Sequence, residues 1–295
     1  MHQLLQGDCL DVITSFPDNY FHAVCTDPPF GIFEYTEKEL LKLRKGSGGI
    51  WRIPPSFGGS ARKPLPRFSI LTNEQKLHIQ NYFEIFAQAL FSKLRPGAHI
   101  LLASNPTLMC YIQMAFIQSG YENRATIMRV YNGFRGGDRP KGAETEFSNV
   151  CVSPRANYEP WLLFRKPITE RTISANLRKW QTGGLRMCLD GSIFPDVIKS
   201  EKTPQNEKNI INHPSLKPQK FLRSLVYSLL PLGQGIILDP FAGSGSTLAA
   251  CIYHKINSIG IELDDHYYQL AIKAIPQLAS LYPERDLDFS CSKSK

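Results

Sequence analysis

The stretch IILDPFAGSGST, residues 236–247, decides the fold of this chain. Its first three residues are apolar and predict a buried strand, which runs into an acidic turn and a glycine–serine loop. Thr247 then starts an apolar helical pattern that continues to Tyr253. A strand, a glycine turn and a helix start together present a small-molecule site at the carboxyl edge of an open α/β sheet. The stretch therefore predicts a ligand site on a fold of this class.

The residues of this loop indicate which ligand it would hold. Gly243 and Gly245 lack a Cβ, so the backbone can turn tightly and approach a ligand. A second strand, predicted at residues 258–263, ends near Glu262, about 20 residues past the loop, where such folds place a carboxylate against ribose hydroxyls. Asp239 would repel a diphosphate and attract a cation, and the third glycine of a dinucleotide fingerprint is missing. These features favour a nucleoside-containing cofactor, and a glycine turn without a ligand is the alternative.

Composition sets broad limits on the fold and the partners. The chain has 295 residues, 42% of them hydrophobic, which suits one large α/β domain with insertions or one domain with a small lobe. It lacks the roughly 18 consecutive apolar residues of a membrane helix. Its first residues have no basic region followed by an apolar run, so we expect no signal peptide there. Seven scattered cysteines without C-x-x-C spacing argue against a zinc site or a disulfide framework and fit a reducing cytoplasm. The net charge of +8 favours a polyanionic partner.

A second turn of unusual chemistry follows residues 22–26 (HAVCT), which predict a short strand. The strand stops at Asp27, Pro28, Pro29 and Phe30. Two successive prolines cannot continue a central strand, and the first of them keeps Asp27 out of the helical region. The result is a rigid turn that can present groups to a ligand. In a parallel sheet this turn and the glycine loop can meet at the topological switch point.

Alternating patterns elsewhere predict βαβ units and hence a mostly parallel sheet. Thr72 can cap a helix over residues 73–94, which Pro96 and Gly97 would end. Further strands are predicted at residues 98–103, 124–131 and 158–164, and further helices at residues 36–45, 106–118 and 220–230. Residues 3–5 form a short apolar piece, and residues 10–13 give a helical turn.

Three segments lack clear periodicity. Residues 31–71 carry eight basic and three acidic residues with interleaved aromatic ones, which predicts either a mobile nucleic-acid surface or a solvated loop. Residues 132–149 are polar and rich in glycine, and residues 168–212 are interpreted as an inserted recognition lobe. In the second segment Arg135, Arg139 and Lys141 are the candidate DNA contacts, with solvent-exposed charge as the alternative.

Several motifs together resemble the S-adenosylmethionine-dependent DNA amino-methyltransferases. They are DPPF at residues 27–30, DPFAGSGST at residues 239–247, HPSLKP at residues 213–218, GDCLDVI at residues 7–13 and YEPWLLFRK at residues 158–166. The order, with DPPF first and FAGSGS last, is similar to the permuted beta class of that family. The resemblance covers most of the chain. It implies a doubly wound, mostly parallel seven-stranded α/β sheet of the Rossmann-like methyltransferase type with an inserted recognition lobe.

The resemblance also implies how the chain is divided. Residues 1–167 would form the catalytic part, residues 168–212 the target-recognition insertion and residues 213–283 the cofactor-binding part of the same domain. Residues 284–295 would be a loose tail.

The family implies catalytic roles for the DPPF turn. Asp27 and the Pro28 carbonyl would accept the two hydrogens of the target amino group, Pro29 completes the motif, and Phe30 would stack on an extruded base. Positive charge develops on the target nitrogen during transfer, and Asp27 would stabilise it. Neither a metal nor a covalent nucleophile is needed.

The resemblance implies a binding site for S-adenosyl-L-methionine as well. The glycine loop would wrap the methionine part, Asp239 would lie near its ammonium, and Glu262 would accept from the ribose. Asp8 and Cys9 would lie near the adenine, and the HPSLKP segment would close over the cofactor. The full set is Asp8, Cys9, His213, Ser215, Lys217, Asp239, Pro240, Phe241, Ala242, Gly243, Ser244, Gly245, Ser246, Thr247, Glu262 and Leu263.

The motifs indicate the identity of the target base less directly than the reaction. Aspartate at the first motif position is more usual among adenine-N6 enzymes, whereas serine is more usual for cytosine-N4, so the resemblance favours adenine. Phe30 departs from the commoner tyrosine, which leaves cytosine-N4 as the alternative. Methylation of RNA or of a protein amide, and a catalytically silent nucleic-acid binder, are more remote alternatives. The expected partner is double-stranded DNA in the cytoplasm, in a restriction-modification or epigenetic system; a homodimer and a cognate restriction endonuclease both stay open.

Overall fold

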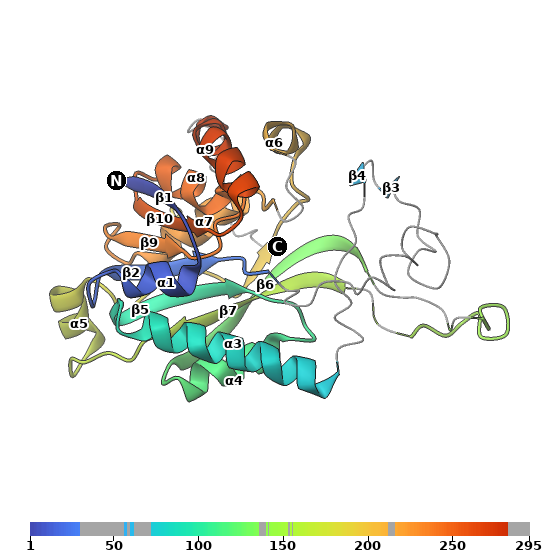
Figure 1. Cartoon of the computed structure of the whole chain (residues 1–295), viewed down its shortest axis with the longest axis horizontal. Coiled ribbons are helices and arrows are strands. Elements are labelled where there is room, and N and C mark those ends of the chain that lie inside the picture. The colour runs from blue at the N-terminus through green and yellow to red at the C-terminus, as the bar shows by residue number, and fades with distance from the viewer. Residues whose placement is uncertain are drawn as a thin grey trace.

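A twisted sheet runs through the described part of the chain (Figure 1). The computed structural model describes residues 1–29, 56–57, 60–61, 72–135, 140, 142–152, 154, 156–211 and 216–282. Among these residues the sheet has eight strands, which are, in spatial order, β1 (His2–Gln6), β10 (Asn257–Glu262), β9 (Ile236–Asp239), β2 (Phe21–Thr26), β5 (Leu94–Ala103), β7 (Ala156–Arg165), β6 (Glu122–Arg135) and β8 (Val197–Lys199). A separate two-stranded pair joins β3 (Ser56–Phe57) to β4 (Ser60–Ala61).

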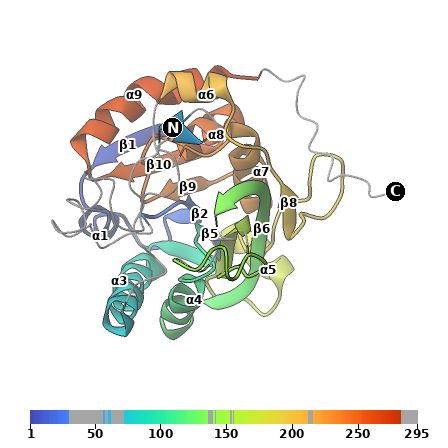
Figure 2. The ribbon, with the colours of Figure 1, turned by 90° about the vertical axis from the view of Figure 1, so that its right-hand side faces the viewer.

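Helices cover both faces of the sheet, as the side view in Figure 2 shows. One core joins the sheet to α1, α3 and α4, and a second core joins its other face to α7 and α8. The described helices are α1 (Cys9–Thr14), α3 (Asn73–Phe91), α4 (Met109–Gln118), α5 (Ile173–Trp180), α6 (Gln205–Ile210), α7 (Gln219–Leu229), α8 (Ser246–Tyr253) and α9 (Asp265–Ser280). In the described residues, none of the helices combines the length and apolar character needed to cross a membrane.

The apolar run of β2 follows from this layering. Val24 packs into the core of α1, α3 and α4, whereas Ala23 and Cys25 pack into the core of α7 and α8. A strand that is covered on both faces is apolar throughout rather than alternating with polar residues. This explains why the central strands were predictable from short uninterrupted apolar runs.

The topological switch point lies between β2 and β9. These two strands are neighbours and parallel, with Val24 opposite Leu238. From β2 the chain continues through α3 to β5 on one side, and from β9 it continues through α8 to β10 on the other. The turns that leave β2 and β9 therefore emerge side by side at the same edge, which is where open α/β sheets bind ligands.

The start of α3 agrees with the sequence-based expectation, whereas its end and the start of β5 differ from it. Thr72 caps α3 as predicted, with a reciprocal capping box to Gln75. The helix ends at Phe91, earlier than predicted, and Pro96 and Gly97 lie inside β5 rather than before it. A register shift between β2 and β5 accommodates them, because a bulge lets a strand contain residues that cannot pair.

The doubly wound, mostly parallel α/β fold is confirmed, with two additions. β8 pairs in parallel with β6 and makes an eighth strand where seven were expected. β7 runs antiparallel to both of its neighbours, β5 and β6. Residues 168–212 contribute α5, β8 and α6, and their role in target recognition stays a prediction. The helix predicted at residues 36–45 and the tail at 284–295 lie outside the described residues.

Candidate functional site

The two turns singled out in the sequence meet at the switch point. The Thr26 hydroxyl, one residue before the DPPF turn, donates to Asp239 Oδ1 over 2.7 Å. Asp239 also accepts from the backbone N–H of Phe241 at 3.2 Å. The end of β2 and the start of the glycine loop are thus held together by a buried side-chain contact.

The glycine loop is tightly packed against α9. Gly245 has φ +74° and precedes the first residue of α8. A Cβ at this position would lie 2.3 Å from Ile275 Cγ1, which is far inside van der Waals contact. The Ala242 N–H donates to the Ile261 carbonyl at 2.8 Å, and this bond ties the loop to β10. The loop can therefore keep this course only with glycine at position 245.

Glu262 is fixed beside the loop by backbone donors. Its Oε2 accepts from the Gly243 N–H at 2.7 Å, and its Oε1 accepts from the Asp264 N–H at 2.9 Å. The side chain remains partly exposed, and a carboxylate has further lone pairs to offer. Glu262 can thus still accept hydrogen bonds from a ligand.

The residues predicted near the adenine lie at the same edge. The Gly7 N–H donates to the Glu262 carbonyl at 3.0 Å, so the turn containing Asp8 adjoins Glu262. Asp8 caps α1 by accepting from the Leu10 N–H at 2.8 Å. Cys9 is buried, which raises the pKa of its thiol to about 11. The thiol is therefore protonated and contributes an apolar surface rather than a nucleophile.

Asp239 itself is a buried carboxylate. It is 3% exposed, and burial raises its pKa to about 6, against the opposing effect of hydrogen bonds from Thr26, Thr247 and the Phe241 N–H. Ser244 and Ser246 bond each other at 2.8 Å. Pro240 and Ala242 are buried, Phe241 is half-buried and Leu263 is exposed.

Asp27 occupies the end of β2 with Pro28 buried and Pro29 exposed beside it. Asp27 Oδ2 accepts a hydrogen bond from the Lys217 ammonium. Its Oδ1 is buried and has no hydrogen-bond partner among the described residues. Burial raises the pKa of Asp27, and Lys217 only partly opposes this effect. The turn thus presents a carboxylate with one oxygen still free to accept.

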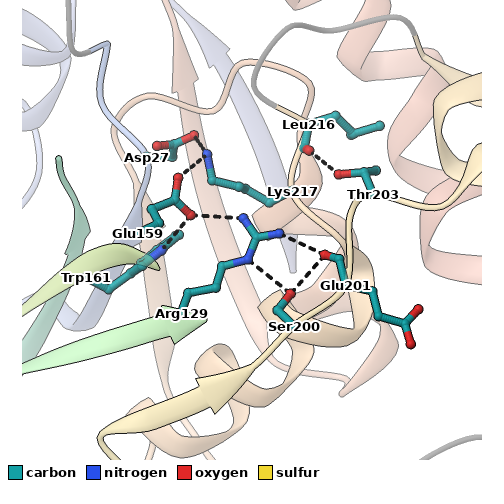
Figure 3. A network of polar contacts seen from close by, with 9 residues as sticks. All are labelled: Asp27, Arg129, Glu159, Trp161, Ser200, Glu201, Thr203, Leu216 and Lys217. Carbon is teal, nitrogen blue, oxygen red and sulfur yellow. Dashed lines mark hydrogen bonds and ion pairs between the residues drawn. The ribbon is translucent and has the colours of Figure 1, made fainter. Parts of the chain in front are cut away.

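Lys217 links Asp27 to a chain of charged residues that the sequence analysis did not single out (Figure 3). Lys217 Nζ lies 3.3 Å from Glu159 Oε1. Glu159 Oε2 accepts from Arg129 at 2.9 Å and from the Trp161 indole at 3.2 Å. In the sequence, Glu159 was noted only as part of the YEPWLLFRK motif, and Arg129 was not recognised as a site residue. Their pairing depends on the register between β6 and β7, which the sequence pattern does not reveal. The role predicted for Lys217 at the cofactor stays a prediction beside this observed contact.

Several candidate residues cannot be placed. Phe30, Arg139, Lys141, His213 and Ser215 lie outside the described residues. Arg135 ends β6, but its side chain is likewise not described. In the described part of the chain, no group of three or more His, Cys, Asp or Glu residues could hold a metal ion.

Comparison with known proteins agrees with this geometry. A family model described as DNA methylase, N6_N4_Mtase, matches residues 21–273. "Putative methylase YubD" of Escherichia coli (strain K12) is 43% identical over 270 residues, which cover 91% of this chain and 88% of that protein. The Type II methyltransferase M.HindIII of Haemophilus influenzae is 23% identical over 303 residues, which cover 92% of this chain and 94% of that protein.

A solved structure supports the fold. The Thermus thermophilus protein TTHA0409, complexed with S-adenosyl-L-methionine, has a TM-score of 0.59 at 19% identity and covers 96% of each chain. The match of the family model over most of the chain, on a fold whose two motif turns meet at the switch point, shows that this chain belongs to the N6/N4 DNA methylase family.

Proposed function

We propose that this protein transfers the methyl group of S-adenosyl-L-methionine to the exocyclic N6 of a flipped adenine in double-stranded DNA, at a specific site. The observation that carries the proposal is the position of Asp27. Its buried carboxylate, with one unpartnered oxygen, stands at the end of β2, directly beside the glycine loop that follows β9. A target amine and a methyl donor can be held side by side there.

The residues around the loop fit S-adenosyl-L-methionine. When bound, this cofactor supplies an electrophilic methyl group on a positively charged sulfur. Glu262, held by two backbone N–H groups, would accept from the ribose hydroxyls. The negative charge of Asp239 beneath the loop favours a cationic ligand over a diphosphate. The absence of a side chain at Gly245 lets the loop pack closely against Ile275 of α9, which fixes the course of the backbone that would surround the ligand.

The target amine needs two acceptors. Asp27 and the Pro28 carbonyl would accept its two hydrogens and so direct the nitrogen lone pair at the methyl carbon. The amine nitrogen would bond to the methyl carbon that the bound cofactor supplies, as that carbon leaves its sulfur, and the nitrogen would become cationic. Asp27 stabilises that charge and accepts one proton, which it then passes to water. Because a base within the duplex cannot reach this turn, it must be flipped out.

The direct test is product analysis. Duplex DNA incubated with the protein and isotopically labelled S-adenosyl-L-methionine is digested to nucleosides and separated by mass spectrometry. N6-methyladenine is the expected product, because Asp27 stands where serine is more usual for cytosine-N4 enzymes. N4-methylcytosine would overturn the choice of base, and label found only in RNA or in protein would overturn the substrate.

The role of Asp27 is tested with a matched pair of variants. Asp27→Asn keeps the shape but removes the charge that stabilises the cationic nitrogen, so turnover should fall roughly 100-fold or more. Asp18→Asn is the control, because Asp18 forms an exposed ion pair with Lys93. Equal activity of the two variants would remove Asp27 from the reaction.

DNA contacts are proposed for Arg135, Arg139 and Lys141, and target recognition is proposed for residues 168–212. If the three basic residues contact phosphates, changing them to alanine should reduce the dependence of DNA affinity on salt by about one unit of slope for each contact. A slope equal to that of the wild type would place them outside the interface.

A further inference from the structure

We propose that Glu159 is a positioning residue for methyl transfer, which receives the Lys217 ammonium when the target amine takes that ammonium's place on Asp27. The inference rests on the proposed function, since it assumes that Asp27 accepts the target amine. It adds Glu159 and Arg129 to the residues on which the reaction depends.

Lys217 already occupies one of the two oxygens of the carboxylate to which the amine is expected to bind, and only Oδ1 has no partner among the described residues. Its ammonium donates to Asp27 Oδ2, which is the interaction that an exocyclic amine would make with the same carboxylate. The ammonium and Asp27 are both largely buried, with 10% and 15% of their side chains exposed. The amine must therefore share Asp27 with Lys217 or displace it.

A second acceptor for the ammonium is already in place. Glu159 Oε1 lies 3.3 Å from Lys217 Nζ, slightly beyond the usual hydrogen-bond distance. Lysine has three donors and can turn from one carboxylate to the other with a small movement. A shift of the ammonium toward Glu159 would shorten this contact and leave Asp27 Oδ2 for the amine.

The surroundings of Glu159 keep that acceptor aimed at Lys217. Arg129 and Trp161 both donate to the other oxygen, Oε2. Arg129 lies directly opposite Glu159 across the antiparallel pair β6–β7, where facing side chains share one side of the sheet. Arg129 is held in turn by the Ser200 hydroxyl at 3.0 Å and the Glu201 carbonyl at 3.1 Å. Glu159 Oε1 is thus the oxygen left for the ammonium.

The charges explain why two carboxylates surround one lysine. When all four groups are ionised, the two carboxylates of Asp27 and Glu159 balance the two cations of Lys217 and Arg129. Transfer adds positive charge to the target nitrogen next to Asp27, and a nearby ammonium would oppose it. Movement of Lys217 toward Glu159 takes the like charge away from the reacting nitrogen.

Other ionisable groups near Asp27 are engaged elsewhere. Asp239 on β9 accepts from Thr26 and from the Phe241 N–H. Burial raises the pKa of Cys25 well above its usual value, so its thiol is uncharged. Besides burial, the balance between Asp27 and Lys217 is therefore set mainly by the charges of Glu159 and Arg129.

Two variants should shift the titration of Asp27 in opposite directions. In Glu159→Gln the ammonium pairs with Asp27 alone, so the pKa of Asp27 should fall; in Lys217→Met the carboxylate loses its cation, so its pKa should rise. Carbon-13 NMR of aspartate-labelled full-length protein measures both, with the Asp27 signal assigned from Asp27→Asn. Glu170→Gln is the control, because Glu170 pairs with Lys179 at the surface. Shifts in the same direction would overturn the proposal.

Kinetics at pH 9, which favours the ionised form of Asp27, give a second and independent test. Glu159→Gln should lower kcat/KM for DNA on the order of tenfold to a hundredfold and leave the Kd for S-adenosyl-L-methionine unchanged, because Lys217 can no longer leave Asp27. The double variant Glu159→Gln/Lys217→Met should recover part of that loss, since nothing then competes with the amine. Both variants are measured at saturating S-adenosyl-L-methionine, because Lys217 is itself predicted to contact the cofactor. A double variant no better than Glu159→Gln would then overturn the proposal, because a merely structural role predicts no recovery.

A substitute variant and the activity of the wild type separate this proposal from misfolding and from failure of the proposed function. If Glu159→Gln does not fold, Glu159→Asp replaces it, because the shorter side chain withdraws the carboxylate from Lys217 and keeps its charge. The fall in kcat/KM should then be smaller than the fall expected for Glu159→Gln. No fall in kcat/KM would count against the proposal. Wild-type protein that methylates no DNA would refute the proposed function. The NMR titration needs no turnover and would still decide whether Asp27 and Glu159 share the ammonium.

Discussion

The Thr26 hydroxyl donates a hydrogen bond of 2.7 Å to Asp239 Oδ1, across 213 residues of sequence. This contact joins the strand that ends in the DPPF turn to the strand that ends in the glycine loop. It is one of three hydrogen bonds that offset the cost of burying the Asp239 carboxylate. The two halves of the site are thus coupled through a single buried acceptor.

Thr26→Val should test that coupling. Valine has nearly the same shape but leaves one donor fewer for a buried charge, which costs about 1–3 kcal/mol of unfolding free energy. Urea unfolding measures the loss, and Thr14→Val is the control, since the Thr14 hydroxyl makes only an exposed contact with the Asp11 carbonyl. Similar losses in both variants would show that the buried bond stabilises nothing.

The same variant makes a prediction about pH. The pKa of Asp239 in the folded protein is about 6, above its unfolded value, so the folded carboxylate is mostly neutral at pH 5 and ionised at pH 8. The Thr26 bond matters most for the ionised form. The stability gap between wild type and Thr26→Val should therefore be larger at pH 8 than at pH 5, and the reverse order would contradict the assignment.

Gly245→Ala should be far more harmful than a glycine change of the same backbone conformation elsewhere. Both Gly245 (φ +74°) and Gly191 (φ +79°) are left-handed, but only the Cβ at 245 would meet Ile275, at 2.3 Å. Gly191→Ala should cost about 1–2 kcal/mol for the backbone alone, and Gly245→Ala about 1–3 kcal/mol more for overpacking. Ile275→Ala removes the clashing Cγ1, so it should lessen the extra cost when combined with Gly245→Ala. Thermal unfolding of the set measures each step.

Much of this site could be predicted from sequence, for a physical reason. β2 and β9 are covered on both faces, so they appear as apolar runs, and the proline and glycine turns mark where they end. Parallel neighbours place such turns at one edge, which is why the meeting of the DPPF turn and the glycine loop was predictable. Helix α9 was not predicted; it contains Pro276, and an internal proline normally ends a helix.

The charged chain behind Asp27 could not be predicted. Glu159 and Arg129 are 30 residues apart and meet only because β7 runs antiparallel between β5 and β6. A one-residue change of register would send one of the two side chains to the other face of the sheet. The strand predicted at residues 158–164 is present although Pro160 has no N–H to donate. The Pro160 carbonyl accepts from the Ser104 N–H, and the Met128 N–H opposite it donates to the Asp196 carbonyl instead. No backbone donor is therefore lost.

Glu262→Gln should weaken cofactor binding. The amide offers one acceptor oxygen where the carboxylate has two, and its NH2 would face one of the two N–H groups that now donate to Glu262. Loss of a charged hydrogen bond corresponds to roughly a tenfold to hundredfold increase in the Kd for S-adenosyl-L-methionine. Isothermal titration calorimetry measures it, with Glu74→Gln on the exposed first turn of α3 as control. An unchanged Kd would mean that Glu262 does not contact the ribose.

His22 should make the protein less stable in mild acid. The residue is 5% exposed, and its Nδ1 accepts from the Ile236 N–H at 3.1 Å. Burial, aided by the charge of Arg95, lowers the pKa of its ring to about 4. The unfolded chain takes up a proton near pH 6.5 while the folded chain does not, so stability that is present above pH 6.5 is lost as the pH falls. From His22 alone, the loss between pH 7.5 and 5.5 should be about 1.4 kcal/mol. His22→Gln keeps an acceptor that does not titrate, so its unfolding free energy, measured in urea at both pH values, should fall by that much less than the wild type's. An equal fall in both proteins would show that the acid sensitivity arises at other groups.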